Sequence, residues 1–314
     1  MNPRSGGGAA IRGGVADLAR RQDIEAVVLT HGQDLAALAR AAIADGADAL
    51  GMAGGDGSLA VVAATAAAHE VPFVCVPAGT RNHFALDLGV DRRDLAGALD
   101  AFSNGIERRI DMGEVNGRMF LNNVSIGVYG DAVQQPAYRD AKARTLLESA
   151  LQVLGPSARA PDLVLTDDAG RQHRQPAVVL VSNNPYALDQ PGVGATRPAL
   201  DTGQLGIVVL DTPADRPRPP ARAWTAARLE VLAPAMVHAG IDGEAAGLSG
   251  PLRFAVRPAV LRVRISSRHP GRRHRRGLPT AGQRRRTPSG TMAEAAMAAR
   301  PCLGNVSVPR LADR

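Results

Sequence analysis

A glycine-rich turn, Gly54-Gly55-Asp56-Gly57-Ser58, lies between a short apolar run and an alanine-rich segment. The run at 47–51 is typical of a buried strand and the segment at 59–69 of a helix. Three glycines within four residues leave backbone N–H groups uncovered, and the start of a helix favours negative charge. The sequence therefore predicts a phosphate-binding turn between a strand and a helix.

Asp56 is the unexpected member of this turn, because a carboxylate repels phosphate unless a metal, a water or a donor lies between them. Its presence favours a nucleoside triphosphate carried with Mg²⁺. The alternative is a tight turn without a ligand, in which Ser58 caps the helix.

Composition limits the class of protein. At 314 residues the chain is long enough for two domains, and its 45% hydrophobic and 3% aromatic content predicts a core of Ala, Val and Leu. No apolar window is long enough to span a bilayer, and no basic and apolar leader opens the chain, which predicts a soluble, cytoplasmic protein. Cys75 and Cys302 form neither a disulfide framework nor a metal pattern.

The net charge of +7 belongs to the last part of the chain. Residues 268–314 hold eleven arginines against two acidic residues, whereas the remainder has 26 basic and 28 acidic residues. This segment is rich in Pro, Gly and Ser, which predicts a disordered basic tail. It is either an arm for an anionic membrane or nucleic acid, or an incidental tail. It lacks the aromatic residues of a single-strand binder, so no specific nucleic-acid partner is expected.

Strands and helices alternate in the first third of the chain, which predicts an α/β domain with a parallel sheet over residues 1–104. Strands are expected at 25–30, 47–51 and 71–76, and helices at 11–21, 35–44, 59–69 and 94–102. A second turn, Pro77-Ala78-Gly79-Thr80-Arg81-Asn82-His83, ends the last of these strands. It should emerge beside the Asp56 turn, because the carboxyl ends of parallel strands share one edge.

The pattern changes after Asn104, where strands predominate, and this predicts a β-sandwich-like domain over residues 105–267. Strands are expected at 106–115, 118–125, 162–166, 177–182, 205–210 and 253–265, with one helix at 141–154. Late in this domain, Asp242-Gly243-Glu244 lies between apolar segments. Paired carboxylates suit a base and its partner in phosphoryl transfer, although Asp-Gly is also typical of a solvated β-turn.

Together and in this order, the motifs resemble the diacylglycerol kinase catalytic-domain family, which includes sphingosine kinases and soluble bacterial lipid kinases. The resemblance covers residues 2 to about 265 and rests on seven segments: Asn2-Pro3-Arg4-Ser5-Gly6, the Asp56 turn, 77–82, Asp111-Met112-Gly113, 120–127, Leu200-Asp201-Thr202-Gly203 with Leu205, and Asp242-Gly243-Glu244 with Pro251-Leu252. It implies a nucleotide-binding α/β domain, a β-sandwich and a cleft between them. The implied reaction transfers the γ-phosphate of ATP to a hydroxyl of diacylglycerol or a related lipid.

The resemblance also implies roles for single residues. Asp242 would be the general base, with Glu244 as its neighbour. Asp56 and Asp111 would join a water-linked acidic network to Mg²⁺, and Asp201 would be the carboxylate of a structural Mg²⁺ loop. The residues expected at the nucleotide are Asn2, Ser5, Gly54, Gly55, Asp56, Gly57, Ser58, Thr80 and Asn82. The implied partners are a membrane lipid, a membrane surface in transient, peripheral contact, and a second copy of the chain.

The sequence departs from the family pattern at three places. The family's first strand is missing before Asn2, His83 stands where an aspartate is common, and Thr202 stands where an acidic residue often precedes the glycine.

Two other functions are alternatives to a lipid kinase. A NAD kinase-like enzyme, which shares a similar Gly-Gly-Asp-Gly turn, is the first alternative. The second is a nucleotide- or lipid-binding protein that has lost catalysis.

Overall fold

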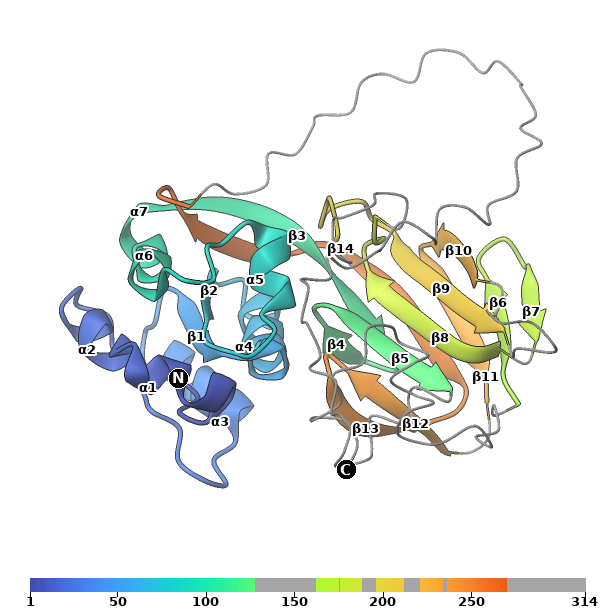
Figure 1. The fold of residues 1–314 in the computed structure, drawn as a ribbon, viewed down its shortest axis with the longest axis horizontal. Coiled ribbons are helices and arrows are strands. Elements are labelled where there is room, and N and C mark those ends of the chain that lie inside the picture. The colour runs from blue at the N-terminus through green and yellow to red at the C-terminus, as the bar shows by residue number, and fades with distance from the viewer. Residues whose placement is uncertain (128–161, 175, 188–195, 212–220, 234–235, 270–314) are drawn as a thin grey trace, which may run out of the picture.

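The computed structural model describes residues 1–127, 162–174, 176–187, 196–211, 221–233 and 236–269 (Figure 1). Parallel strands surrounded by helices form an N-terminal lobe, and antiparallel strands form a second lobe beside it. The predicted combination of a parallel sheet with a β-rich second region is therefore confirmed. The helix predicted at 141–154 lies outside the described residues.

The N-terminal lobe is built on β1 and β2, which pair in parallel from Leu50 opposite Phe73 to Gly54 opposite Pro77. Helix α4 packs against β1, β2 and β14, and α3 packs against α4. The elements of this lobe are η1 (Ser5–Gly7), α1 (Ala9–Arg12), α2 (Val15–Arg20), α3 (Leu35–Ala44), β1 (Leu50–Gly54), α4 (Asp56–Ala68), β2 (Phe73–Pro77), α5 (His83–Leu88), α6 (Leu95–Leu99) and α7 (Ala101–Asn104).

The second lobe consists of an antiparallel six-stranded sheet, in the order β10-β9-β8-β5-β12-β13, packed against part of an eight-stranded sheet. The eight-stranded sheet runs β1-β2-β14-β11-β6-β7, with β3 on β14 and β4 on β3. The remaining strands are β3 (Gly105–Val115), β4 (Arg118–Phe120), β5 (Asn123–Gly127), β6 (Val164–Asp167), β7 (Gln172–Arg174), β8 (Pro176–Asn183), β9 (Leu205–Asp211), β10 (Ala221–Ala226), β11 (Arg228–Leu232), β12 (Met236–Ile241), β13 (Glu244–Ser249) and β14 (Leu252–Ser266).

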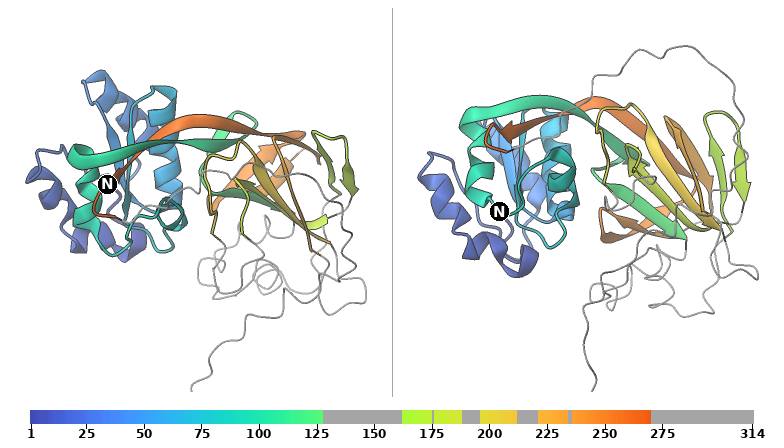
Figure 2. Two further views of the ribbon diagram at one scale, coloured as in Figure 1. Left: turned by 90° about the horizontal axis from the view of Figure 1, so that it is seen from above. Right: turned by 45° about the horizontal axis from the view of Figure 1, so that its top comes forward.

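Two long strands, β3 and β14, pass from one lobe to the other (Figure 2). The first part of β14 pairs with β11 of the second lobe, whereas Val263 and Arg264 pair in parallel with β2. The sequence prediction assigned all of 105–267 to the second domain. In the structure the end of β14 instead extends the N-terminal sheet. The edge of β2 that does not pair with β1 has backbone N–H and C=O groups that need hydrogen-bond partners, and β14 supplies them.

Asp111 lies where these two strands bend. The register of β3 against β14 shifts between Arg257 and Leu261, and Ala259 within that bulge has a φ of 51°. The buried Asp111 carboxylate accepts the N–H of Ala259 at 2.9 Å through Oδ1 and the N–H of Gly203 at 2.7 Å through Oδ2. This side chain therefore fixes the bulge at the crossing between the lobes.

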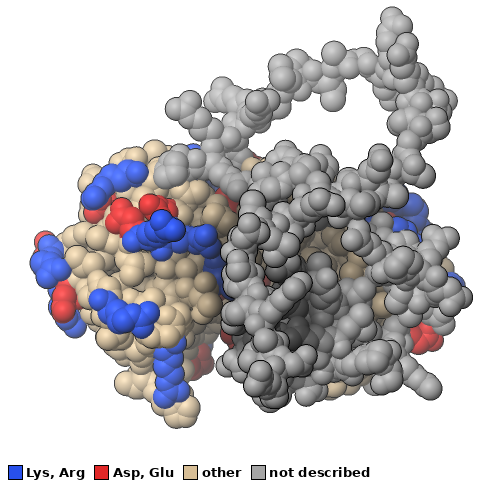
Figure 3. Space-filling view, viewed as in Figure 1, with Lys and Arg blue, Asp and Glu red and all other residues tan. Residues whose placement is uncertain are grey.

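Each lobe has its own hydrophobic core, and both are mainly aliphatic, as the composition predicts. Leu59 and Phe73 are fully buried in the N-terminal core, and Phe120 and Val231 in the second. Cys75 is a buried free thiol in the N-terminal core, and burial raises its pKa. Outside residues 268–314 the basic and acidic residues nearly balance in number. In agreement with this, Figure 3 shows arginines and acidic side chains interspersed over the visible face of the N-terminal lobe.

The run at 25–30 was predicted as a strand, but the structure assigns it no secondary structure. Its backbone contact is with Met1, whose ammonium donates to the Val27 carbonyl and whose carbonyl accepts the Leu29 N–H. Asn2 in turn donates its N–H to the Ala53 carbonyl, so the first two residues lie between this run and β1. A strand needs a backbone partner along its length, and one residue does not supply it.

The segment predicted as one strand at 118–125 is divided into β4 and β5 by Leu121 and Asn122.

Of the segment predicted as a tail, residues 270–314 lie outside the described part of the chain. Arg268 and His269 belong to the N-terminal lobe, where their side chains contact Asp100 and Asp94. No helix among the described residues is both long and apolar enough to cross a membrane.

We expect Asp111→Ala to lower the free energy of unfolding by about 2–4 kcal/mol, because a buried side chain is lost and two partly buried N–H groups lose a charged acceptor. Urea unfolding followed by circular dichroism measures this change. Glu114→Ala on the same strand is the control, since it removes only the partly exposed ion pair with Arg257 and should cost no more than about 1 kcal/mol. Equal losses in the two variants would contradict the role assigned to Asp111.

Candidate active site

Three glycine-rich segments meet at the carboxyl ends of β1 and β2. Ser5 Oγ accepts the N–H of Gly55 at 3.2 Å, and Asn2 Nδ2 donates to Ser58 Oγ at 3.2 Å. Gly79 faces Gly55 so closely that a Cβ on Gly79 would lie 2.5 Å from the Gly55 Cα. The fold thus gathers the first loop, the Asp56 turn and the second turn, which the sequence predicted to lie together.

The second turn is shaped by Asn82, whose left-handed φ of 51° is one that asparagine tolerates. Its Oδ1 accepts the Gly79 N–H at 2.8 Å, and its Nδ2 donates to the Gly79 carbonyl at 2.8 Å. The buried amide thus holds the turn closed on itself. Thr80, also predicted at the nucleotide, is exposed at the tip of this turn.

Asp56 joins the two turns. It is the first residue of α4, and its two carboxylate oxygens accept the N–H groups of His83 and Phe84, each at 3.2 Å. These two residues begin α5, so the Asp56 side chain fixes the start of α5 beside the start of α4. The His83 residue is exposed.

Asp242 stands at the tip of the β12–β13 hairpin. Asp242 and Gly243 have φ values of 50° and 84°, as in the two-residue turns that join twisted strands. The residue is only 8% exposed, and its carboxylate accepts the N–H groups of Leu121 at 2.9 Å, Asn122 at 2.7 Å and Asn123 at 3.2 Å. The hairpin turn is therefore not the solvated turn of the alternative interpretation.

The surroundings of Asp242 move its pKa in opposite directions. Burial raises the pKa, to about 6, and the nearby negative charge of Asp56 adds to that rise. The three backbone N–H groups lower the pKa because they favour the ionised form. The carboxylate is thus ionised at neutral pH yet close enough to its pKa to accept a proton.

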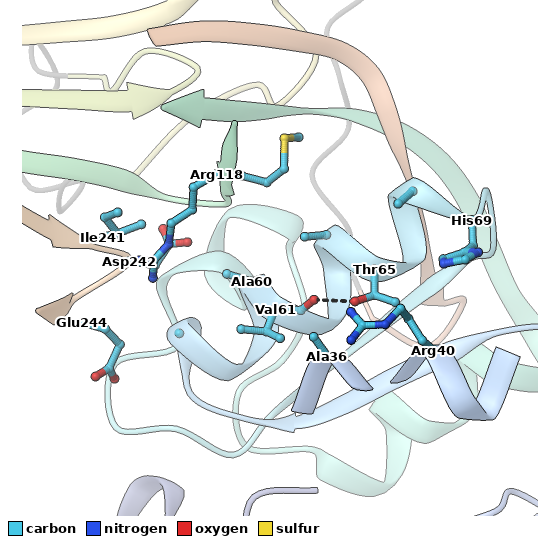
Figure 4. A pocket seen from close by; sticks show the side chains of 14 residues that line it. Ala36, Arg40, Ala60, Val61, Thr65, His69, Arg118, Ile241, Asp242 and Glu244 are labelled. Atoms are coloured by element: carbon cyan, nitrogen blue, oxygen red, sulfur yellow. Dashed lines mark hydrogen bonds between the residues drawn. The ribbon is translucent and has the colours of Figure 1, made fainter. Parts of the chain in front are cut away.

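A cavity of about 460 Å³ is lined by the Asp242 hairpin and by α4. Asp242 and Arg118 stand at one end of it, Arg40 and His69 at the other, and α4 forms the wall between them (Figure 4). This wall is largely apolar and presents Ala60, Val61, Ala64, Thr65 and Ala68. The cavity therefore combines a carboxylate with an apolar surface.

Glu244 connects the hairpin to the first turn of α4. A Cβ on Gly57 would lie 2.7 Å from Glu244 Cγ, so the hairpin approaches the Asp56 turn as closely as a glycine allows. Both residues line the same cavity as Asp242. Glu244 thus lies directly against the predicted phosphate turn, and the predicted base, Asp242, lines the same cavity as that turn.

The three carboxylates predicted for Mg²⁺ are not gathered together. Both Asp111 oxygens accept backbone N–H groups, and Asp201 is exposed in the loop before Gly203. In that loop, the Thr202 hydroxyl donates to Asn184 Oδ1 at 2.6 Å. The described residues contain no group of three or more His, Cys, Asp and Glu side chains placed to hold one metal. Metal binding by these carboxylates remains a prediction.

Comparisons with known proteins agree with this geometry. The family model of the diacylglycerol kinase catalytic domain matches residues 1–115. A Pseudomonas aeruginosa protein named "Probable lipid kinase YegS-like" is 31% identical over 258 residues, which cover 73% of this chain and 80% of that protein. The chain belongs to the diacylglycerol kinase family of lipid kinases. The resemblance predicted from the motifs is thereby confirmed, and the family is one of phosphotransferases that act on an alcohol group.

Other relatives match over shorter stretches. A diacylglycerol kinase of Mycobacterium tuberculosis is 34% identical over 118 residues, and the chain spans 38% of the length of that protein. For a diacylglycerol kinase of Bacillus subtilis, the identity is 44% over 72 residues, or 24% of its length.

A crystal structure of a diacylglycerol kinase from Bacillus anthracis shares the fold, with a TM-score of 0.60 at 17% identity over 85% of this chain and 95% of that one.

Arg197 is a buried residue of this protein that the sequence analysis did not identify. Arg197 has no exposed surface, and its guanidinium forms an ion pair with Asp87 of α5 and reaches the carbonyls of Leu121 and Asn183. The sequence carries no motif around Arg197 that signals burial, because arginine is usually exposed. The contact exists only once α5 and the β4–β5 turn are folded together.

We expect Gly79→Ala to separate the two turns and to lower the free energy of unfolding by about 1–3 kcal/mol, because the new methyl group would collide with the Gly55 Cα. Gly55→Ala is the matched control from the other side of the same contact, where a Cβ meets its nearest neighbour at 3.7 Å. Denaturant unfolding of the two variants measures the difference. If Gly55→Ala proves the more damaging, the close approach assigned to Gly79 is wrong.

Proposed function

We propose that this protein is an ATP-dependent lipid kinase that transfers the γ-phosphate to a hydroxyl of diacylglycerol or a related lipid, with Asp242 as the general base. The observation that carries the proposal is the position of Asp242. This buried carboxylate, with a pKa of about 6, shares one cavity with Gly57 of the glycine-rich turn and with an apolar wall of α4.

The glycine-rich turn supplies a place for the phosphates. Helix α4 begins at Asp56 after Gly55, and no side chain caps its first turn, so its N–H groups remain for an anion. Ser58 and Asn2 add polar side chains at the same point. Mg²⁺ would arrive with ATP and neutralise charge on the phosphates, and Asp56 is the predicted metal carboxylate that lies at this turn.

Asp242 would then take the proton of the lipid hydroxyl as the hydroxyl oxygen attacks the γ-phosphorus. The bond from the γ-phosphorus to the bridging oxygen breaks, ADP leaves with that electron pair, and the proton stays on the carboxylate until solvent removes it. The three backbone N–H groups hold the carboxylate in place throughout. Positioning and charge neutralisation supply most of such catalysis.

The wall of α4 suits the apolar part of the acceptor. It runs from Gly57 to Ala68, about 16 Å at the helical rise of 1.5 Å per residue. Arg118 lines the same cavity as Asp242, at the same end of it in Figure 4, and would stabilise charge on the transferred phosphoryl group. A lipid entering this cavity would come from a membrane surface, which makes the protein a peripheral, transiently bound enzyme.

We expect Asp242→Asn to lower kcat at least about 100-fold while the affinity for ATP stays within about threefold, because the variant loses the base but keeps the glycine-rich turn. Transfer of labelled γ-phosphate from Mg-ATP into vesicles that contain diacylglycerol measures kcat. Parallel reactions should use a total lipid extract and NAD as acceptors. Fluorescent nucleotide binding measures the affinity.

Asp167→Asn is the matched control for this experiment. Asp167 is a buried carboxylate that also accepts backbone N–H groups, but it lies at the end of β6 and does not line the cavity. Its variant should retain activity. Full turnover by Asp242→Asn would refute the base, labelling of NAD alone would favour the NAD kinase-like alternative, and ATP binding without transfer to any acceptor would favour a binding protein.

The pH dependence of turnover gives an independent test. Activity requires ionised Asp242, so kcat should rise with pH through about 6 and should lie about tenfold below its plateau at pH 5. Initial rates between pH 4.5 and 8, at saturating Mg-ATP and lipid, measure this limb. A profile that is flat across this range would contradict proton transfer to Asp242.

A further inference from the structure

Arg197 connects the N-terminal lobe to the segment that holds Asp242. Its Nε donates to Asp87 Oδ2 at 2.7 Å, and its backbone N–H donates to Asp87 Oδ1 at 3.0 Å. On the other side, Nη1 donates to the Leu121 carbonyl at 2.5 Å and Nη2 to Asn122 Oδ1 at 2.7 Å. One fully buried guanidinium therefore joins α5 to the turn between β4 and β5.

The same turn lies between Arg197 and Asp242. The Leu121 carbonyl and the Asn122 N–H belong to one peptide unit, and that N–H makes the shortest bond to Asp242, at 2.7 Å. A cation on the carbonyl side polarises the peptide and strengthens its N–H as a donor. Arg197 thus binds one side of the Leu121–Asn122 peptide unit, and Asp242 binds the other side.

The chain of contacts continues to the glycine-rich turn. Helix α5 starts at His83 and Phe84, whose N–H groups bind Asp56, and ends one residue after Asp87. A single short helix therefore carries the Asp56 contact at one end and the Arg197 contact at the other. The Asp56 contact at the start of α5 is made by backbone N–H groups, so it does not itself require the Arg197 side chain.

We propose that Arg197 is a positioning residue for the reaction: through the Leu121–Asn122 peptide it holds and polarises the donors that orient Asp242. This inference rests on the proposed function, in which Asp242 is the base. Arg197 touches neither nucleotide nor acceptor in this account. It acts on the reaction only through the turn at 121–123.

Other charged and titratable groups also surround Asp242. Asp56 on α4 opposes its ionisation, and Tyr186 lies close enough for Asp242 to raise the Tyr186 pKa. Glu244 and Arg118 line the cavity with Asp242. Arg197 lowers the Tyr186 pKa and Asp87 raises it, whereas variants of these two residues leave all four of the other side chains in place. A difference between the pH profiles of the Arg197 and Asp87 variants therefore reports on the ion pair and its guanidinium.

The test is Arg197→Lys, which keeps a cation near Asp87 but cannot bond Asp87, Leu121 and Asn122 together. We expect kcat at pH 7 to fall about tenfold, with KM for ATP within about twofold, since the chemical step loses orientation while the phosphate turn is intact. The acidic limb of kcat against pH should move up by roughly one unit, because a weaker N–H donor stabilises the carboxylate less. Raising the pH to 8–9 should therefore restore part of the activity.

Two further variants separate this role from a structural one. Arg171→Lys alters another arginine paired with a buried carboxylate, Asp167, away from the cavity, and its pH limb should stay in place. Asp87→Asn leaves the guanidinium on the Leu121 carbonyl with less compensating charge, so its limb should stay or move to lower pH. A structural role alone would give Arg197→Lys and Asp87→Asn the same direction of change.

The inference is overturned if Arg197→Lys, folded by circular dichroism, keeps the wild-type limb and kcat, or if Asp87→Asn moves the limb upward. Should Arg197→Lys not fold, the direction seen in Asp87→Asn decides. Asp242→Asn is run beside them. Turnover by that variant would refute the proposed base, whereas an inactive Asp242→Asn with an unshifted Arg197→Lys would refute only the role of Arg197.

Discussion

Carboxylates that accept backbone N–H groups join distant segments of this molecule, and two of the three, Asp111 and Asp242, are buried. Asp56 binds the start of α5, Asp111 binds the bulge of β14 and the loop at Gly203, and Asp242 binds the turn at 121–123. Each side chain joins segments that are far apart in the sequence. Bonds from an ionised acceptor are stronger than neutral ones, and losing one leaves buried donors unpaired. The arrangement of the candidate site depends on these three residues.

The long strands β3 and β14 give these contacts their setting. Because both strands run through the two lobes, the hairpin that carries Asp242 is tied to the sheet behind the glycine-rich turn. Glycine at position 57 lets Glu244 approach α4, and the cavity beside it is lined by the proposed base, Asp242, by Gly57 of the glycine-rich turn and by an apolar wall. That combination suits phosphoryl transfer to the hydroxyl of an apolar acceptor, in agreement with membership of a lipid kinase family.

Local patterns predicted much of this from the sequence. The spacing of apolar residues located α3 at 35–44, and the two glycine-rich turns were placed at one sheet edge, where Gly79 and Gly55 meet. What the sequence did not reveal depends on distant contacts. The Leu121–Asn122 turn interrupts an apparently continuous strand because its N–H groups bind Asp242, and Arg197 is buried only because Asp87 and the carbonyls of that turn surround it. Neither partner is a neighbour in sequence.

The most direct test of the account is a crystal structure with Mg²⁺ and a non-hydrolysable ATP analogue. We expect the phosphates to lie on the Gly54–Ser58 turn, with the γ-phosphate in the cavity and facing the Asp242 carboxylate. We also expect the turn at 121–123 to keep its bonds to Asp242. A nucleotide bound away from the Gly54–Ser58 turn, or a γ-phosphate outside the cavity that Asp242 lines, would contradict the role proposed for Asp242.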